Sequence, residues 1–320
     1  MIRYVTHTCV GLLLIGSSLW AVDSVAKFEP PIGKVLLLVG STQEDIQGYM
    51  DVTHTLPAGL MGYVAIGGEG LDSPYSEGSG TQDLPKLAGD YPGTVLQIGL
   101  YIVDSCAAIA LGDKDADIDR LGDWFQKTRR PIFLRPGYEF DGPHNHYPPK
   151  DYIQAYRRIV DRFRKHGVQN VAFVWHSYAS VGSSHLAQWY PGDDYVDWVG
   201  ISYFNQPQSY MQPVITFARE HNKPVMICES CPAMIQTKYS SAWRMWFVPL
   251  FKYIQANNIK ALCYINHVWD AGPQFSKLHW GDTRLQSNPE ILQQWLLETS
   301  QDRYLKFESN LFKLLGFNSD

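Results

Sequence analysis

The chain has 320 residues, of which 45% are hydrophobic and 18% are charged. This is an ordinary globular composition, and the length suffices for one large domain with a substantial core. A formal net charge of −5 gives no general attraction to nucleic acid or to an anionic membrane, so neither is expected as a partner. The aromatic content is high, with 10 Trp, 19 Tyr and 14 Phe. We expect most of these rings in the core and the remainder against a ligand.

The first 26 residues have the pattern of a secretory signal peptide. Residues 1–3 supply one positive charge, residues 9–16 form a short apolar core, and Ala21 and Ala26 are small residues suited to cleavage. The apolar core is too short to span a bilayer stably. We therefore expect residues 1–26 to be removed, which leaves a secreted or periplasmic domain of residues 27–320 with no membrane attachment. An uncleaved anchor is the alternative.

Short apolar runs rich in β-branched residues follow in chain order, and amphipathic stretches lie between them. The predicted strands are 35–39, 62–66, 95–102, 132–138, 171–175, 198–203, 225–229 and 261–265. The predicted helices are 117–127, 150–166, 210–221, 241–257 and 288–300. The helix over 150–166 is the clearest, because apolar residues recur in it at helical spacing directly after two prolines.

Continuous apolar strands that alternate with helices indicate a parallel sheet. Eight such units in residues 27–320 predict an α/β fold consisting of a single (β/α)8 TIM barrel. A doubly wound sheet is the alternative, but it would need a phosphate-binding glycine loop after the first strand. Residues 40–44 lack that glycine spacing, and the glycine-rich segment 67–70 follows the second strand without a matching helix start.

Two of the predicted strands lead into glutamates. Glu139 follows the fourth strand, between two aromatic residues, and Glu229 closes the seventh. In a barrel the carboxyl ends of the strands converge on one face, and these two strands lie on opposite walls. Two facing carboxyl groups are the minimal equipment for cleaving a glycosidic bond, at about 5 Å for a retaining reaction and about 6.5–9.5 Å for an inverting one. Rim carboxylates paired with Arg or Lys are the alternative interpretation.

The same face would gather polar and aromatic side chains from other strand ends, namely Tyr63, Asp104, His176, Tyr203 and Trp269. One glutamate must hold a proton near neutral pH and the other must stay ionised, so their surroundings must differ. Tyr203 could donate a hydrogen bond to Glu229. Arg135 could supply a positive charge deeper in the barrel.

Histidines are frequent at or near this face, at His144, His146, His176 and His267. They could be satisfied by protein neighbours, donate to neutral sugar hydroxyls, or recognise sulfate or carboxylate groups. Metal binding by His144 and His146 is a further alternative. No second pair of Cys or His at suitable spacing supports zinc, so no metal site is predicted. The four cysteines beyond residue 26 are expected to be small buried fillers, with one disulfide as the alternative.

The segment from Trp189 to Tyr203 is similar to the sixth-strand signature of glycoside hydrolase family 26, which holds β-mannanases and a few other β-glycanases. Residues 135–142 resemble the acid/base motif of that family, and residues 223–229 resemble its nucleophile strand. The resemblance covers residues 130–270, with a weaker fit before. It implies a clan A barrel, a retaining double displacement, Glu139 as acid/base and Glu229 as nucleophile. It also implies Trp269 as the platform under the sugar being cleaved.

The chain departs from the family pattern within the substrate cleft. Tyr138 stands where the family usually has His, and residues 143–147 replace a tryptophan-rich segment. We expect a secreted, retaining endo-β-glycanase that acts as a monomer on a polysaccharide or oligosaccharide and requires no cofactor. The family default is β-mannan, and a β-1,3-glucan or a sulfated or anionic algal polysaccharide are the alternatives. The expected substrate contacts are Tyr63, Arg135, Tyr138, His144, His146, Trp175, His176, Tyr203, His267 and Trp269.

Two other classes of protein compete with this interpretation. A non-catalytic carbohydrate-binding barrel would keep aromatic residues in a cleft but would have no need for both glutamates. A metal-dependent hydrolase or deacetylase barrel would need His and Asp ligands converging from several strands. The early strands offer no His-x-His pair, and metal analysis of the purified protein would separate this class from the first.

Overall fold

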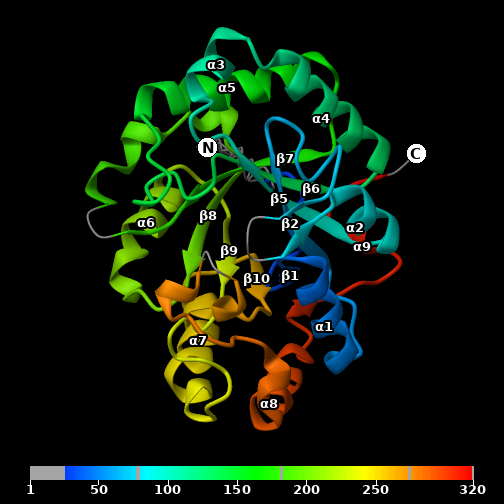
Figure 1. The fold of residues 1–320 in the computed structure, drawn as a ribbon, viewed down its shortest axis with the longest axis vertical. Coiled ribbons are helices and arrows are strands. Elements are labelled where there is room, and N and C mark those ends of the chain that lie inside the picture. The colour runs from blue at the N-terminus through cyan, green and yellow to red at the C-terminus, as the bar shows by residue number, and fades with distance from the viewer. Residues whose placement is uncertain (1–25, 77–79, 181–182, 273–274, 319–320) are drawn as a thin grey trace, which may run out of the picture.

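A computed structural model describes residues 26–76, 80–180, 183–272 and 275–318 of the chain (Figure 1). The predicted signal peptide falls, apart from its last residue, on residues 1–25, which lie outside the described ranges. Within those ranges, no helix combines the length and the apolar character needed to cross a membrane.

Eight parallel strands form a closed barrel. In chain order they are β1 (Val35–Gly40), β2 (Gly59–Ala65), β5 (Val95–Tyr101), β6 (Ile132–Pro136), β7 (Val171–Ser177), β8 (Trp198–Tyr203), β9 (Val225–Ser230) and β10 (Ala261–Ile265). Each strand pairs with the next, and β10 pairs with β1 through Ala261 opposite Leu36, which closes the sheet. The predicted (β/α)8 barrel is therefore confirmed, and β8 and β10 have the predicted bounds.

Helices surround the barrel (Figure 1). They are α1 (Gln43–Thr53), α2 (Leu84–Asp90), α3 (Cys106–Leu111), α4 (Asp115–Thr128), α5 (Pro149–Lys165), α6 (Gln212–Glu220), α7 (Val248–Ala256), α8 (Pro289–Thr299) and α9 (Leu311–Leu314). The predicted helices correspond to α4, α5, α6 and α8, and to a π-helical turn, Trp243–Phe247, that continues into α7. The helices α1, α2, α3 and α9 were not predicted.

Short strands extend this framework at two places. β11 (Tyr304–Leu305) pairs with the start of β1, outside the closed ring of eight strands. β3 (Tyr75–Ser76) and β4 (Thr81–Gln82) form a separate antiparallel pair between β2 and α2.

The strand side chains alternate between two buried layers. On β7, Ala172 and Val174 belong to the cluster that fills the barrel, whereas Phe173 and Trp175 belong to the layer between barrel and helices. The helices complete that outer layer with amphipathic faces. On α5 the buried residues recur at helical spacing, at Tyr152, Ala155, Tyr156, Ile159, Val160 and Phe163. Because the strands are buried on both faces, most of their side chains are apolar, and polar side chains gather mainly at the carboxyl ends and in the following loops.

Candidate active site

Glu139 lies just beyond the end of β6, in a segment with left-handed backbone. Gly137 has a φ of 58° and Glu139 itself has a φ of 52°, a region that glutamate rarely adopts. A side chain at position 137 would lie 2.6 Å from the ring of Tyr152, so this close approach requires glycine. Asn145 braces the segment by donating to the carbonyl oxygens of Tyr138 and Glu139. Such backbone strain is typical of a functional position. Glu139 is also buried, with 6% of its surface exposed.

Glu229 reaches the barrel interior through a β-bulge. β8 and β9 shift register where Ser202 pairs with Glu229, which leaves Cys228 as an extra residue on β9. Strict alternation would turn Glu229 outward, because Met226 and Cys228 already point into the barrel. The extra residue restores the inward direction. Gln97 of β5 holds the bulge from across the barrel by donating to the Cys228 carbonyl at 2.8 Å.

Arg135 of β6 forms a buried ion pair with Glu229. Its Nη1 donates to Oε1 of Glu229 at 2.5 Å, and its side chain has no exposed surface. The guanidinium also lies 5.3 Å from the ring centroid of Tyr63 and 5.4 Å from that of Tyr138. Gly99 of β5 makes room for this group, since a Cβ there would lie 2.5 Å from the Tyr63 ring. Arg135 is thus the buried ion-pair partner of Glu229.

A chain of hydrogen bonds continues from Arg135 to Glu139. Nη1 of Arg135 lies 3.1 Å from Nδ1 of His176. Nε2 of His176 lies 3.1 Å from Oγ of Ser202, which donates to Oε1 of Glu139 at 2.5 Å. The other carboxyl oxygen, Oε2, is 2.7 Å from Nε2 of His144, in the loop after β6. Both glutamates therefore belong to one network that runs from the barrel interior to a histidine whose side chain is 49% exposed.

The two carboxyl groups of this network have unequal surroundings. Burial raises the pKa of Glu139, and the negative charge of Glu229 raises it further. Hydrogen bonds from His144 and Ser202 lower the pKa of Glu139 without cancelling the rise. One carboxyl group thus keeps its proton to a higher pH, while the other faces a guanidinium. This arrangement suits a general acid/base opposite a nucleophile.

Tyr63 and Tyr138 line the same region, with ring centroids 5.1 Å apart. Burial raises the pKa of the Tyr63 hydroxyl well above its usual value, and the charge of Glu229 adds to the rise. Tyr63 therefore stays protonated, and its hydroxyl lies 3.8 Å from the sulfur of Met61. Tyr138 remains half-buried beside Arg135, where a ligand can reach its ring.

The predicted residues after β10 form an aromatic corner. Trp269 packs edge-on against His267 and Trp280, with centroid distances of 5.0 and 4.7 Å. Nδ1 of His267 lies 2.8 Å from a carboxylate oxygen of Asp45, so this ring already has a protein partner. His146 is exposed, and its φ of 54° places it on a left-handed turn of the loop after β6.

Trp175 cannot contact substrate as predicted, because its side chain points out of the barrel. It is fully buried in the layer between β7 and the helices, and its ring stacks on Phe140 at 4.4 Å. Its Nε1 donates to the Trp189 carbonyl at 3.1 Å. Phe217 covers another side of the ring at 5.1 Å. Trp175 is therefore a core residue that supports the segment carrying Glu139.

The predicted role of Tyr203 beside Glu229 is also wrong. Its ring lies in the outer layer, and its hydroxyl accepts a hydrogen bond from Gln208 at 2.7 Å instead of donating to Glu229. The preceding residue, Ser202, points inward and was missed. Strand parity finds Ser202 only once the inward side of β8 is known, because adjacent residues of a strand face opposite sides. Tyr63 takes the position beside Glu229 that was predicted for Tyr203.

Asp141 is a second residue that sequence analysis missed. It accepts hydrogen bonds from the Ser177 hydroxyl at 2.8 Å and from the Tyr178 backbone N–H at 2.7 Å. These bonds tie the loop after β6 to the end of β7. Tyr178 then packs edge-on against His144 at 5.3 Å, which orients the histidine that contacts Glu139.

The cysteines are buried and free at all four positions beyond residue 26, Cys106, Cys228, Cys231 and Cys263. The expectation of small buried fillers is thus confirmed over the alternative of a disulfide. Over the described ranges, no group of three or more His, Cys, Asp or Glu side chains is arranged to hold a metal ion.

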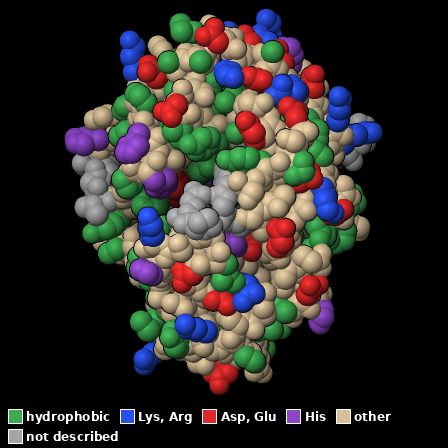
Figure 2. Space-filling model, viewed as in Figure 1, with side chains coloured by type: hydrophobic (Ala, Val, Ile, Leu, Met, Phe, Trp, Pro, Cys, Tyr) green, Lys and Arg blue, Asp and Glu red, His purple; other side chains and the backbone are tan. Residues whose placement is uncertain are grey.

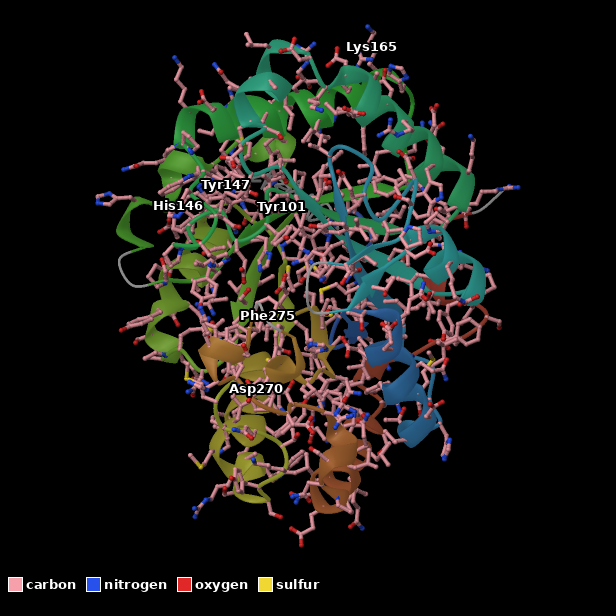
Figure 3. All side chains as sticks on the ribbon, in the orientation of Figure 1. Tyr101, His146, Tyr147, Lys165, Asp270 and Phe275 are labelled. Carbon is pink, nitrogen blue, oxygen red and sulfur yellow. The ribbon has the colours of Figure 1, made fainter. Side chains whose placement is uncertain are left out.

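The face viewed in Figure 2 is hollowed near its centre, beside the atoms drawn in grey, and histidine side chains lie on the rim. Figure 3 labels Tyr101 and His146 on one side of this central region and Phe275 and Asp270 on the other. The end of β5 and the loop after β6 therefore lie across this region from the segment that follows β10.

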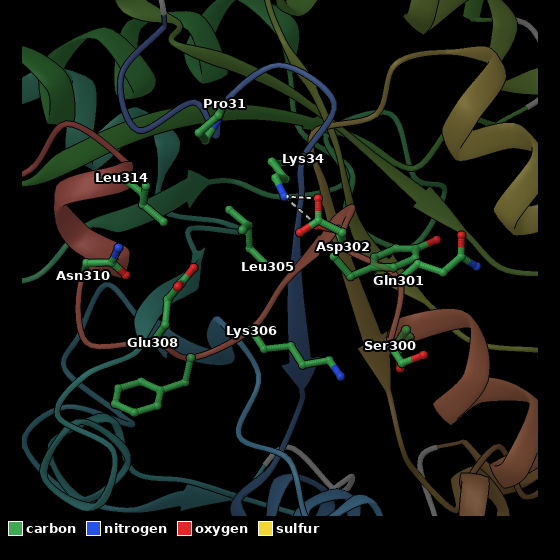
Figure 4. Close-up of a pocket in the computed structure, with 13 residues that line it drawn as sticks. Pro31, Lys34, Ser300, Gln301, Asp302, Leu305, Lys306, Glu308, Asn310 and Leu314 are labelled. Carbon is green, nitrogen blue, oxygen red and sulfur yellow. Dashed lines mark hydrogen bonds and ion pairs between the residues drawn. The ribbon is translucent and has the colours of Figure 1, made fainter.

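A separate cavity of about 510 Å³ lies away from this site (Figure 4). It is lined by β11, by Asn310 and Leu314 around α9, and by the segment before β1, and Lys34 pairs with Asp302 at its edge. Because Lys34 precedes β1, this cavity lies at the amino ends of the strands. Glu139 and Glu229 lie at the carboxyl ends, where barrel enzymes hold their active sites.

The sequence and the fold of this chain resemble those of known glycoside hydrolases. A family model described as glycosyl hydrolase family 26 matches residues 91–241. A beta-1,3-xylanase from Alcaligenes sp is 34% identical, over 89% of this chain and 68% of that protein. A second one, TXYA from Vibrio sp, is 33% identical, over 89% and 69%. A solved GH26 beta-mannanase from Bacteroides ovatus superposes with a TM-score of 0.65 at 15% identity, covering 88% of this chain and 93% of that one.

A (β/α)8 barrel with two buried glutamates at the carboxyl ends of β6 and β9 is typical of a glycoside hydrolase. The chain belongs to glycosyl hydrolase family 26, so the predicted resemblance is confirmed. It is an enzyme that acts on a polysaccharide. The likeness to the beta-mannanase, at 15% identity, concerns the fold alone.

Proposed function

We propose that this chain is a secreted, retaining endo-glycanase that cleaves β-1,3-linked xylan. One observation carries the mechanism: Glu139 is buried with a raised pKa, while Glu229 is held by a buried guanidinium at 2.5 Å. These environments match a proton donor and an ionised nucleophile. Secretion rests on the charged, apolar and small-residue pattern of residues 1–26.

In the first step, Glu229 attacks the anomeric carbon and forms an ester bond to the sugar. The bond between that carbon and the glycosidic oxygen breaks, and the leaving oxygen takes the proton of Glu139. In the second step, the Glu139 carboxylate removes a proton from water, and the resulting hydroxyl attacks the same carbon. The ester bond breaks, Glu229 is released as a carboxylate, and the sugar retains its configuration.

Two relatives support xylan in place of the β-mannan expected as the family default. Both proteins named as beta-1,3-xylanases align over 89% of this chain at 34% and 33% identity. The beta-mannanase is related by fold, at 15% identity. The departures at Tyr138 and at residues 143–147 agree with this choice, because they alter the part of the cleft in which the family default was expected to bind.

The substrate is tested by product analysis on a panel of β-1,3-xylan, β-mannan, β-1,3-glucan and a sulfated galactan. We expect xylo-oligosaccharides from β-1,3-xylan, with an early fall in viscosity that marks endo cleavage. Proton NMR of the first products should show the β-anomer. Preferred cleavage of mannan, glucan or galactan would overturn the substrate, and an initial α-anomer would overturn the retaining mechanism.

The catalytic roles are tested by Glu139→Gln and Glu229→Ala. Loss of a general acid should lower kcat on the polysaccharide by roughly 10²–10⁴-fold. Glu139→Gln should still cleave aryl glycosides with good leaving groups, because such groups depart without a proton. Glu229→Ala should cleave neither the polysaccharide nor the aryl glycosides. Circular dichroism checks that each variant is folded. Near-normal turnover of the polysaccharide by either folded variant would overturn the assignment.

A further inference from the structure

The hydrogen bonds between the two glutamates pass through Arg135 and then through two further buried side chains, His176 and Ser202. His176 has no exposed surface, with Nδ1 at 3.1 Å from Nη1 of Arg135 and Nε2 at 3.1 Å from Oγ of Ser202. Ser202 is equally buried, and its hydroxyl contacts Oε1 of Glu139 at 2.5 Å. Neither residue touches Glu229 directly in these contacts, and no step of the proposed mechanism uses them.

The chemistry of these groups gives the chain one direction. A guanidinium can only donate, so Nδ1 of His176 must accept and carries no proton. Burial and the charge of Arg135 both lower the pKa of His176, which keeps the ring neutral. The ring proton therefore sits on Nε2 and is donated to Ser202. The Ser202 oxygen accepts this bond, and its own hydroxyl proton is donated to Oε1 of Glu139.

We propose that His176 and Ser202 are positioning residues that hold Oε1 of Glu139 as a permanent acceptor, so that Oε2 is the oxygen that carries and delivers the proton. This inference rests on the proposed acid/base role of Glu139. Oε2 is the oxygen on the open side of the site, because its contact is the half-exposed His144 at 2.7 Å. An acid whose proton could move to Oε1 would present it to the barrel interior, away from the glycosidic oxygen.

Several ionisable groups surround Glu139 and the side chains of its hydrogen-bond network. They are Arg135 on β6, His144, Asp141 and Tyr147 in the loop that follows it, Tyr178 after β7, Cys228 and Glu229 on β9 and Tyr63 on β2. Substitution of Ser202 leaves all of these in place. A change in the titration of Glu139 in that variant is therefore due to the lost hydroxyl.

The test is the pH dependence of kcat/KM for the polysaccharide in Ser202→Ala. The hydroxyl stabilises the ionised carboxylate more than the neutral acid, so its removal raises the pKa of Glu139. The acid form then persists to higher pH, and the basic limb should move upward by roughly one to two pH units. Ser202→Thr, which keeps a hydroxyl, should restore the limb. Ser230→Ala is the matched control, because it removes a buried hydroxyl bonded only to the Cys263 carbonyl. The hydrogen-bonded pair of His176 and Ser202 is called the relay below. An unmoved basic limb in Ser202→Ala, or an equal movement in Ser230→Ala, overturns it.

A double variant tests whether the two residues act as one unit. His176→Leu leaves the Ser202 hydroxyl free to rotate, so the limb should move in the same direction but by less. In His176→Leu with Ser202→Ala, the limb should move no further than in Ser202→Ala alone. Movements that add would overturn the relay, because independent sites give additive effects.

Glu139→Gln separates failure of the relay from failure of the proposed function. If Glu139→Gln is strongly impaired while Ser202→Ala leaves the limb unmoved, the relay alone is overturned. If Glu139→Gln hydrolyses the polysaccharide at a near-normal rate, the proposed acid/base role is overturned and the relay falls with it.

Discussion

Arg135→Met should destabilise the fold more than any exchange of an arginine on the surface. The substitution keeps most of the apolar stem but leaves the charge of Glu229 in the barrel without its partner. Arg135 is fully buried and its Nη1 lies 2.5 Å from Oε1 of Glu229. Breaking a buried ion pair of this kind costs about 3–5 kcal/mol, against a total stability of about 5–15 kcal/mol for a native domain.

Urea unfolding followed by tryptophan fluorescence measures this loss, with the midpoint and slope giving the free energy of unfolding. Arg158→Met is the matched control. Arg158 contacts Asp115 through two hydrogen bonds of 2.7 Å, but this pair is partly exposed and should be worth about 1 kcal/mol or less. The two arginines therefore differ mainly in burial.

The double variant Arg135→Met with Glu229→Gln identifies the cause of the loss. Because the cost arises from an uncompensated buried charge, removing that charge should recover a large part of the stability. A loss in Arg135→Met no greater than in Arg158→Met would refute the reasoning. A double variant no more stable than Arg135→Met would refute it as well.

Three further predictions concern single substitutions. His144→Ala removes a hydrogen bond that lowers the pKa of Glu139. The basic limb of the kcat/KM profile should therefore move to higher pH by roughly one unit. A basic limb at the same or a lower pH would contradict this. Trp175→Ala should lower the free energy of unfolding by about 3–5 kcal/mol and leave KM unchanged in the folded enzyme, whereas a raised KM would return this ring to the substrate site. Gly99→Ala places a Cβ against the ring of Tyr63 and the guanidinium of Arg135. Because this displaces the groups beside Glu229, kcat should fall by about a hundredfold. Gly89→Ala, in open space on α2, should leave kcat unchanged, and equal losses in both glycine variants would contradict the argument.

The strands could be predicted because a parallel barrel buries both faces of each strand. Continuous apolar runs such as 171–175 and 261–265 mark such strands without any knowledge of tertiary structure. The same property hides which residues face inward. Trp175 and Tyr203 lie in runs that are apolar on both faces, so their direction is set by the closed sheet, and it is opposite to that predicted.

The direction of Glu229 could not be derived from its own strand. Alternation places it on the outer side, and the bulge at Cys228 reverses this. The brace for that bulge comes from Gln97, on a strand far away in the sequence. By contrast, α1 had a local signal that was missed. Thr42 and Asp45 form a reciprocal capping box at its start, and this spacing is visible in the sequence.

The central claim is that Glu229 forms a covalent bond to the sugar while Glu139 handles the proton. Its most direct measurement is mass spectrometry of the enzyme after reaction with an activated 2-deoxy-2-fluoro glycoside of β-1,3-xylobiose, in which the fluorine slows hydrolysis of the ester. We predict one added disaccharide mass, located by proteolysis on the peptide that contains Glu229. An active enzyme that accumulates no adduct, or an ester found on Glu139, would contradict the account.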